Sequence, residues 1–409
     1  MTEQLKLKLN DSKATRWGAL VIVAFTMMAA YYVNDVVAPL KTMLETDLAW
    51  SSTDFGFFTG GYSFLNVFFL MLIWGGLILD RFGIRFTGKL ATILMVGGTA
   101  LEYYAMTGLA GADATLFGIN EIFGYKTGVF VAFAGYSIFG VGAEVAGITV
   151  SKIIAKWFKG KELATAMGVQ VALARIGSQA GYAVAIPLAR AFGISTPVLL
   201  GLVLLLGGMI AFFIFAVMDK KLDKQMEAAA IAAGTEDEEE KFSFKDVKNI
   251  LVNPGFWLIA LLCVLFYSCV FPFQKFASEL MIIKYGINEN VAGTFAGLPA
   301  LGALILTPVF GGFIDKRGKS ASIMLLGSAM LICVHFIYAI PDINYWLVAI
   351  VLMIILGIAF SLVPSAMWPA VAKIFPVSQL GTAYALIFFI QNIGLWGIPT
   401  LIGWVLFFM

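Results

Sequence analysis

The sequence is poor in charged residues, and this shortage excludes most classes of soluble protein. Only 13% of its 409 residues are charged, whereas 60% are hydrophobic, and the mean hydropathy is +0.91. A single soluble core cannot bury so large an apolar share. The composition therefore predicts a polytopic membrane protein.

Cysteine and histidine are also scarce, which argues against a disulfide scaffold or a metal site. Cys263, Cys269 and Cys333 lie in apolar runs without disulfide or metal-ligand spacing, and we interpret them as buried small hydrophobic residues. The single histidine, His335, is interpreted as a helix-packing residue in preference to a proton relay. Because the sequence shows no nucleophile with a base, metal cluster or phosphate loop, we expect neither an enzyme nor a cofactor.

Long apolar runs are abundant, and they predict eleven membrane-spanning helices. A hydrocarbon core about 30 Å thick requires about 20 apolar residues per helix. Runs of this length lie at residues 17–40, 55–79, 88–109, 127–156, 162–190, 197–218, 254–284, 291–314, 320–340, 345–372 and 379–408. We expect an all-α protein that is a monomer in the lipid bilayer.

The net charge of +2 indicates no nucleic-acid partner, but the distribution of basic residues is informative. Of the 27 Lys and Arg residues, 21 lie in the N-terminal segment or in alternate connections between spans. The positive-inside rule assigns these segments to the cytoplasm. We therefore expect a cytoplasmic N-terminus.

A polar stretch divides the chain into two parts. Residues 219–250 include the run EDEEEK and are interpreted as a solvated cytoplasmic linker between transmembrane bundles at 1–218 and 251–409. A weak internal repeat supports this division, because GGLILDRFGIR at 75–85 returns as GGFIDKRG at 311–318.

The repeated motif carries charged residues that we interpret as a cytoplasmic gate. Its glycines let two helices approach closely, its aspartate can cap a neighbouring helix, and its basic residues can meet acidic groups across the closed gate. The predicted gating residues are Asp80, Arg81, Arg85, Asp315, Lys316 and Arg317.

Two opposite charges are predicted at one depth near the middle of the membrane. Glu144 lies 12 residues before Lys156, and Arg175 lies 13 residues after Glu162, with the basic hinge KWFKGKE between their helices. At about 1.5 Å per residue, both lie roughly 18 to 20 Å from the hinge. A buried charge in a membrane is costly, so the pair indicates either a binding site or a structural ion pair.

The surroundings of these charges favour a binding site. On the helix of Arg175, a polar stripe continues through Ser178, Gln179 and Tyr182 at helical spacing, which suits a wet cavity better than a dry ion pair. Residues expected to line the opposite wall are Tyr267, Gln274, Trp368, Gln391 and Asn392.

The first span and the seventh span carry further candidates. Tyr31 is expected to contact the substrate, and Asp35 is interpreted as a substrate contact, a gate residue or an interfacial residue. Lys275 lies about 30 Å along its helix, and we expect its long side chain to reach the outer interface.

Several ungapped runs carry a resemblance to a known family. They are LDRFGIR at 79–85, FGVGAEVAG at 139–147, WFKGKEL at 157–163, ARIGS at 174–178, FWLIALLCVLFYSCVFPF at 256–273 and MWPAVAKIFPVSQLGTAYALIFFIQNIGL at 367–395. Together with the repeated loop motif, these runs look like the lysosomal dipeptide uniporter branch of the major facilitator superfamily.

This resemblance implies a fold, a substrate and roles for three residues. The fold is two bundles of six helices related by pseudo-two-fold symmetry, so we expect the last of twelve spans to be missing from the sequence. The implied function is facilitated movement of dipeptides. In the family an acidic residue that matches Glu144 holds the peptide's amino terminus, and an arginine that matches Arg175 holds its carboxylate; Asp35 matches an acidic position on span one.

Two other functions and two locations stay open. The chain resembles a transporter, but a proton-coupled symporter of organic anions or amino acids would also use Arg175 and Glu144, and a non-transporting membrane receptor would bind without flux. The predicted outer loops contain no N-x-S/T acceptor and the N-terminal tail no dileucine-type signal. We therefore expect the bacterial inner membrane, with the lysosomal membrane as the alternative.

Overall fold

The computed structural model describes residues 8–408, except 112–113, 159–160, 234–243 and 376. The side chains at 80, 163–164, 229–233, 244–246, 315, 372 and 377–381 also lie outside this description. Within the described ranges, the chain is all-α apart from one two-stranded hairpin, which confirms the predicted fold class.

The chain consists of long helices with three short ones, α2, α8 and α10, between them. In order they are α1 Lys13–Val36, α2 Lys41–Asp47, α3 Ser52–Phe68, α4 Met71–Thr107, α5 Thr127–Trp157, α6 Leu163–Phe192, α7 Thr196–Ala233, α8 Phe244–Val252, α9 Pro254–Ile283, α10 Glu289–Ala296, α11 Leu298–Arg317, α12 Ser320–Ala339, α13 Trp346–Ile374 and α14 Val377–Phe408. Strands β1, Glu121–Ile122, and β2, Tyr125–Lys126, form the hairpin, and 3-10 turns cover Leu9–Asp11 and Ala38–Leu40.

Among the described residues, eight helices are long and apolar enough to cross a membrane. A ninth span is added if α3 and the start of α4, which are bent by 59° relative to each other, count as one broken span. The chain is therefore a multi-pass membrane protein, and the expected total of eleven spans stays a prediction.

The first copy of the repeated motif contains a sharp turn of the chain. Helix α4 is interrupted at Gly83, which has φ +74° and ψ 174°, a conformation that glycine adopts without a steric penalty. The residues before Gly83 complete the second predicted span, and those after it form the third.

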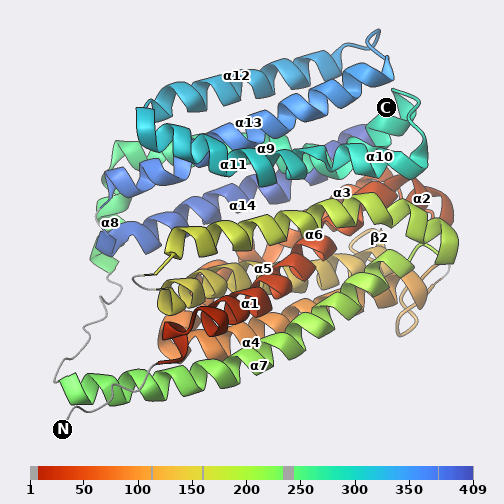
Figure 1. The fold of residues 1–409 in the computed structure, drawn as a ribbon. Helices are drawn as coiled ribbons and strands as arrows, with labels where there is room; N and C mark the ends of the chain where they lie inside the picture. The colour runs from red at the N-terminus through yellow and green to blue at the C-terminus, as the bar shows by residue number, and fades with distance from the viewer. Residues whose placement is uncertain (1–7, 112–113, 159–160, 234–243, 376, 409) are drawn as a thin grey trace.

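The buried apolar side chains form two main clusters that follow the two halves of the sequence. One is built from residues 19–222 with Phe276, and the other from residues 250–387 with Ala38 and Tyr182. Figure 1 shows the helices of the first half, red to green, lying below those of the second half, cyan to blue. Ala38, Tyr182 and Phe276 therefore mark places where the halves interlock.

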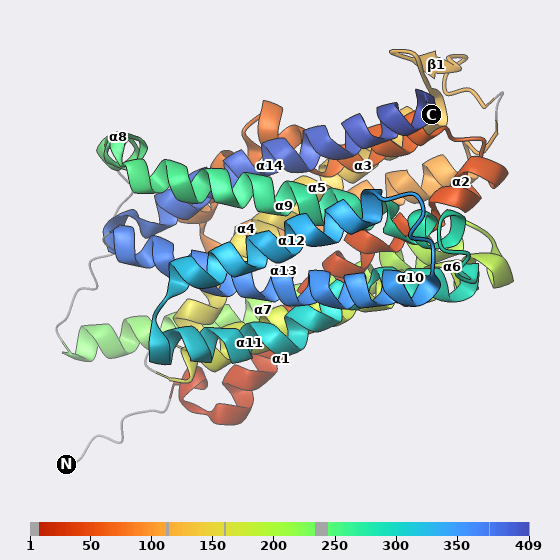
Figure 2. The same cartoon turned by 90° about the horizontal axis from the view of Figure 1, so that it is seen from above.

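The two ends of the helix bundle differ, and we call them the basic end and the hairpin end. The basic end has the start of α1 and the turn between α5 and α6, and the hairpin end has α2, α10 and the β1–β2 hairpin (Figures 1 and 2). At the basic end, Arg16 pairs with Glu162 at 2.7 Å and Lys161 with Asp11 at 2.6 Å. These ion pairs join the start of α1 to the hinge within the first half.

The predicted linker begins as a helix and not as a loop. Helix α7 does not end at residue 218, where the first bundle was predicted to end, but continues to Ala233. Asp219 is fully buried and accepts hydrogen bonds from Lys156 at 2.7 Å and from the Trp157 indole at 3.0 Å, so its surroundings hold this segment against the first half. The EDEEEK run at 236–241 lies outside the described residues.

Candidate functional site

Glu144 lies near the middle of α5, on a helix whose glycines allow close packing. A Cβ atom at Gly140 would meet the carbonyl of Tyr62, and one at Gly142 would meet the carbonyl of Ala91, so neighbouring helices approach these positions directly. The Glu144 side chain is half-buried. One of its carboxylate oxygens accepts a hydrogen bond from the Tyr62 hydroxyl at 3.0 Å, which orients the carboxylate.

Arg175 lies near the middle of α6, between aromatic rings from the two halves. Its guanidinium carbon is 5.4 Å from the centre of the Tyr31 ring on α1 and 5.0 Å from that of the Phe360 ring on α13. Both distances allow cation–π attraction. Arg175 makes no hydrogen bond or ion pair with another described residue, so its in-plane N–H donors are not used by the described part of the chain.

The two central charges share a neighbourhood without bonding to each other. Tyr31 lies close enough to Arg175, Glu144 and Asp35 to interact electrostatically with all three. No ion pair joins Glu144 to Arg175, although both side chains are described. Chemically, this arrangement can hold the two opposite charges of one small ligand.

A cluster of aromatic residues from the second half reaches Arg175 through the Phe360 ring. Tyr267 packs against Phe360 with 6.3 Å between ring centres, and the Trp368 indole donates a hydrogen bond to the Tyr267 hydroxyl at 3.3 Å. The Tyr384 hydroxyl in turn donates to the Trp368 carbonyl at 3.1 Å. The predicted residues Tyr267 and Trp368 are thus brought to the Arg175 side of the second half.

Asp35 is bonded across the boundary between the halves, at the hairpin end. The Lys275 ammonium on α9 lies 3.2 Å from the Asp35 carboxylate and 3.3 Å from the Tyr136 hydroxyl, and it also bonds the Asn34 carbonyl. Asp35 is 7% exposed and Lys275 9%. Of the three interpretations of Asp35, this contact favours a gate residue.

The expectation for Lys275 is wrong. Its side chain does not reach an outer interface, because three oxygen acceptors from the first half surround its ammonium group and replace water. A buried ammonium requires such partners.

Three predicted binding residues lie in the same contact between the halves. The Tyr182 hydroxyl donates to the Gln274 carbonyl at 3.2 Å, and the Gln179 amide donates to the Thr294 carbonyl at 3.4 Å. Tyr182 is 2% exposed and Gln274 5%. These residues therefore belong to the closed hairpin end in this conformation.

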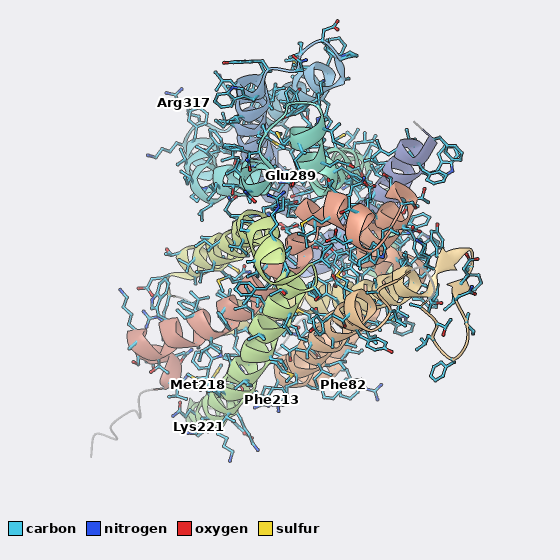
Figure 3. All side chains as sticks on the ribbon, turned by 90° about the vertical axis from the view of Figure 1, so that its right-hand side faces the viewer. Phe82, Phe213, Met218, Lys221, Glu289 and Arg317 are labelled. Carbon is cyan, nitrogen blue, oxygen red and sulfur yellow. The ribbon has the colours of Figure 1, made fainter. Side chains whose placement is uncertain are left out.

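Two further ion pairs close the hairpin end. Lys41, which is 1% exposed, bonds Glu279 of the second half, and Arg190 bonds Glu289. Figure 3, seen from the hairpin end, places Glu289 where the two halves meet. The described polar contacts between the halves gather at this end.

Gln391 and Asn392 are held within the second half. The Gln391 side-chain oxygen accepts a bond from the Cys263 thiol at 3.4 Å, and the Asn392 amide donates to the Phe388 carbonyl at 2.9 Å. Both residues are buried. The described contacts do not bring either residue to Arg175.

The predicted gating residues at the basic end make no polar contact between the halves in the part of the chain that the structure describes. Arg85 pairs with Asp223 at 3.1 Å on α7 of its own half. Arg81 lies 5.6 Å from the Phe82 ring. Lys316 and Arg317 are exposed, and the side chains of Asp80 and Asp315 lie outside the described residues.

Sequence reasoning missed the residues that support the central charges. Phe360 lies in a uniformly apolar run, so nothing in its surroundings distinguishes it from core. Tyr62 shares one face of α3 with Thr59 and Asn66, a polar pattern that the sequence reasoning did not use. Tyr136, which contacts Lys275 and not the central charges, is 2% exposed within an apolar helix.

The single histidine and the three cysteines lie outside the central site. His335 packs against Phe273, with 4.9 Å between ring centres, and its Nε2 bonds the Cys269 carbonyl at 2.9 Å. Cys263 is buried as predicted, but the expectation is wrong for Cys269 and Cys333, which lie on exposed faces of α9 and α12. Among the described residues, no group of three His, Cys, Asp or Glu side chains is arranged to hold a metal ion.

Comparison with known proteins gives one family and one group of relatives. Residues 20–397 match the Major Facilitator Superfamily. The human protein named lysosomal dipeptide transporter MFSD1 is 29% identical over 407 residues, which cover 96% of this chain and 80% of that protein. The Gallus gallus protein of the same name is 33% identical over 285 residues, which cover 66% of this chain and 61% of that protein.

Solved structures show the same fold at low identity. The nucleoside transporter NupG aligns with a TM-score of 0.68 at 13% identity and covers 95% of this chain and 90% of its own. A bacterial homologue of the human lysosomal transporter Spinster, in an inward-facing and occupied conformation, aligns with a TM-score of 0.64 at 15% identity, covering 96% and 82%.

Proposed function

The chain belongs to the Major Facilitator Superfamily of membrane transporters, and from this premise we propose that it moves dipeptides across the membrane as a uniporter. The two halves rock around the central pair of Glu144 and Arg175, so that the site opens to one side at a time. The substrate leaves as it entered, so the proposal requires no covalent chemistry.

The observation that carries the proposal is the environment of Arg175. Aromatic rings pack against the guanidinium from Tyr31 and Phe360, while no described residue bonds its N–H donors. The planar edge of a guanidinium matches a carboxylate with two parallel hydrogen bonds. Arg175 therefore suits the carboxylate end of a dipeptide.

Glu144 suits the other end of the same molecule. A dipeptide is a zwitterion whose ammonium and carboxylate groups lie several ångströms apart. Glu144 is bonded on one oxygen by Tyr62, and its second oxygen can accept from an ammonium group. Because Glu144 and Arg175 are not paired with each other, a ligand that bridges them would satisfy both charges.

The names of the relatives support the dipeptide as substrate. The human and Gallus gallus proteins are named lysosomal dipeptide transporters. At 29% and 33% identity, these names support dipeptides as the substrate class.

The location belongs to the same proposal. We place the basic end in the cytoplasm by the positive-inside rule, with the bacterial inner membrane as the location and the lysosomal membrane, which the relatives' names favour, as the alternative. In that orientation the hairpin end is the outer end, and the described ion pairs between the halves close it.

The test is a thermal-shift screen of the purified protein against dipeptides, free amino acids, tripeptides and dicarboxylates. Stabilisation confined to dipeptides is expected. Arg175→Lys and Glu144→Gln should each abolish that stabilisation while the unliganded protein keeps its unfolding midpoint, and Glu227→Gln, at an exposed position on α7, should behave as the unmodified protein. A response to dicarboxylates alone would overturn the substrate assignment.

Transport in liposomes separates uniport from proton coupling. A uniporter equilibrates a dipeptide and is indifferent to a proton gradient. Accumulation above the external concentration that an uncoupler abolishes would replace uniport by symport.

A further inference from the structure

The connection between α4 and α5, at the hairpin end, presents two phenylalanines at the tips of tight turns, one turn just before the β1–β2 hairpin and the other closing it. Each turn consists of a Phe-Gly pair, Phe117–Gly118 and Phe123–Gly124, between paired backbone segments. Phe117 is 95% exposed and Phe123 is 88% exposed. These are the two most exposed large hydrophobic side chains among the described residues.

The backbone at both tips is unfavourable for phenylalanine. Phe117 and Phe123 have φ of +54° and +52°, and each following glycine has φ of +80°, as a type I′ turn requires. Asparagine or glycine normally occupies the first of these positions, because a bulky side chain at positive φ is strained. An aromatic residue that is both strained and exposed points to a use of its side chain.

The hairpin is fixed to the helices, so the tips have a defined position. The Tyr125 ring stacks on Phe57 of α3, with 3.9 Å between ring centres. Lys126 bonds the Ala49 carbonyl, and the Thr127 hydroxyl donates to the Ile119 carbonyl at 2.8 Å.

The hairpin lies on the flank of the bundle, where the membrane surface would meet it. In Figures 2 and 3 it extends beyond the neighbouring helices at the hairpin end. Below it, ring contacts continue from Phe57 to Phe133 at 4.0 Å, to Phe64 at 5.1 Å and to Phe68 at 4.9 Å. Phe68 is 52% exposed, so the aromatic series joins the hairpin to the lipid-facing surface.

An apolar hollow lies beside the hairpin. Its volume is about 430 Å³, and its lining includes Tyr125 of the hairpin with Trp396 and Trp404 of α14. Tryptophan and tyrosine are enriched where proteins meet the polar boundary of a bilayer. The hairpin therefore continues a surface with the composition of a membrane interface.

We propose that the Phe117 turn and the β1–β2 hairpin together form a membrane-surface anchor whose Phe117 and Phe123 side chains insert into the interfacial layer of the lipid bilayer. The partner is lipid and not a second protein, because the tips are aromatic, lie on the flank and are continuous with the lipid-facing surface. The inference depends on the chain's being a membrane protein and is independent of its substrate.

The test places a fluorescent label beside the tips and leaves both phenylalanines intact. Thr115→Cys, exposed next to the first turn, is labelled with an environment-sensitive nitrobenzoxadiazole dye in protein whose native cysteines are replaced. In liposomes containing lipid with a spin label at a shallow acyl position, quenching is expected to be at least twofold stronger than at Asp342→Cys, an exposed loop position at the same end.

Two paired variants separate anchoring from turn structure. Phe117→Asn with Phe123→Asn gives the turn sequence that type I′ geometry prefers, so the hairpin should persist while lipid quenching at Thr115→Cys falls by at least half. Phe117→Leu with Phe123→Leu stays apolar and should retain most of the quenching. Equal quenching at both label positions, strong quenching by aqueous iodide at Thr115→Cys, or equal behaviour of the Asn and Leu variants would overturn the anchor.

Discussion

Replacing Lys275 with alanine is expected to open the hairpin end. Its ammonium lies 3.2 Å from the Asp35 carboxylate and 3.3 Å from the Tyr136 hydroxyl, across the boundary between the halves. In Lys275→Ala, Asp35 is buried without its cation as long as the hairpin end is closed. Opening hydrates the carboxylate, so the penalty falls on the closed conformation alone.

The size of the effect follows from the geometry of the pair. At 3.2 Å the gross attraction is about 5 kcal/mol with an effective dielectric constant of 20, and removing one partner of a buried pair costs about 3–5 kcal/mol. A cost of about 3 kcal/mol lowers the ratio of closed to open molecules about 150-fold. Asp35→Asn combined with Lys275→Ala leaves no unpaired charge and should recover most of this loss.

The assay measures how often the hairpin end opens. Ala38→Cys is a small change at a residue that is 2% exposed and packs with the second half. In protein without the native cysteines, a membrane-impermeant maleimide added from the hairpin end should label Ala38→Cys at least tenfold faster in Lys275→Ala than in its parent. Lys221→Ala, at the exposed site labelled in Figure 3, is the control. An unchanged rate in Lys275→Ala, or equal rates in the single and double variants, would refute the reasoning.

Three further predictions address the site, the packing and the hinge. Phe360→Ala removes one ring from Arg175 and should weaken dipeptide binding about 5- to 30-fold in thermal-shift titrations. Gly177→Ala places a methyl group against a carbonyl of α1 and should cost about 1–3 kcal/mol in denaturant unfolding, whereas Gly18→Ala, with no neighbour within 4 Å, should not. The Arg16 hydrogen bond lowers the pKa of Glu162, so the difference in unfolding midpoint between Glu162→Gln and the unmodified protein should be full above about pH 4.3 and shrink as pH falls through the lowered pKa.

Apolar run length predicted the helices well, because in a membrane every backbone group must be satisfied within its own helix. Run length cannot locate a sharp change of direction inside a helix. The bend between α3 and α4 and the interruption at Gly83 depend on local backbone geometry. Run length also did not show that α7 continues into the predicted linker, where the buried contacts of Asp219 hold it; the linker bounds stay a prediction.

The central charges were predictable because helical rise converts residue counts from a shared hinge into depth. That argument places Glu144 and Arg175 correctly near the middle of α5 and α6. It fails for Lys275, whose partner Asp35 lies 240 residues away along the chain. Depth along one helix does not reveal which side chain of another helix lies at the same height.

The ion pairs at the hairpin end suit the uniport proposed above. Lys41–Glu279, Lys275–Asp35 and Arg190–Glu289 join the halves. Opening separates each ion pair and hydrates its charges, and the lost attraction and the gained hydration are often close to balance. Opening an apolar contact would instead cost about 25 cal/mol for each Å² of apolar surface exposed. A uniporter needs two conformations of similar free energy, because substrate binding alone shifts their populations. A closure built from paired charges meets that need, and the same balance explains why removing one partner should disturb the cycle more than removing both.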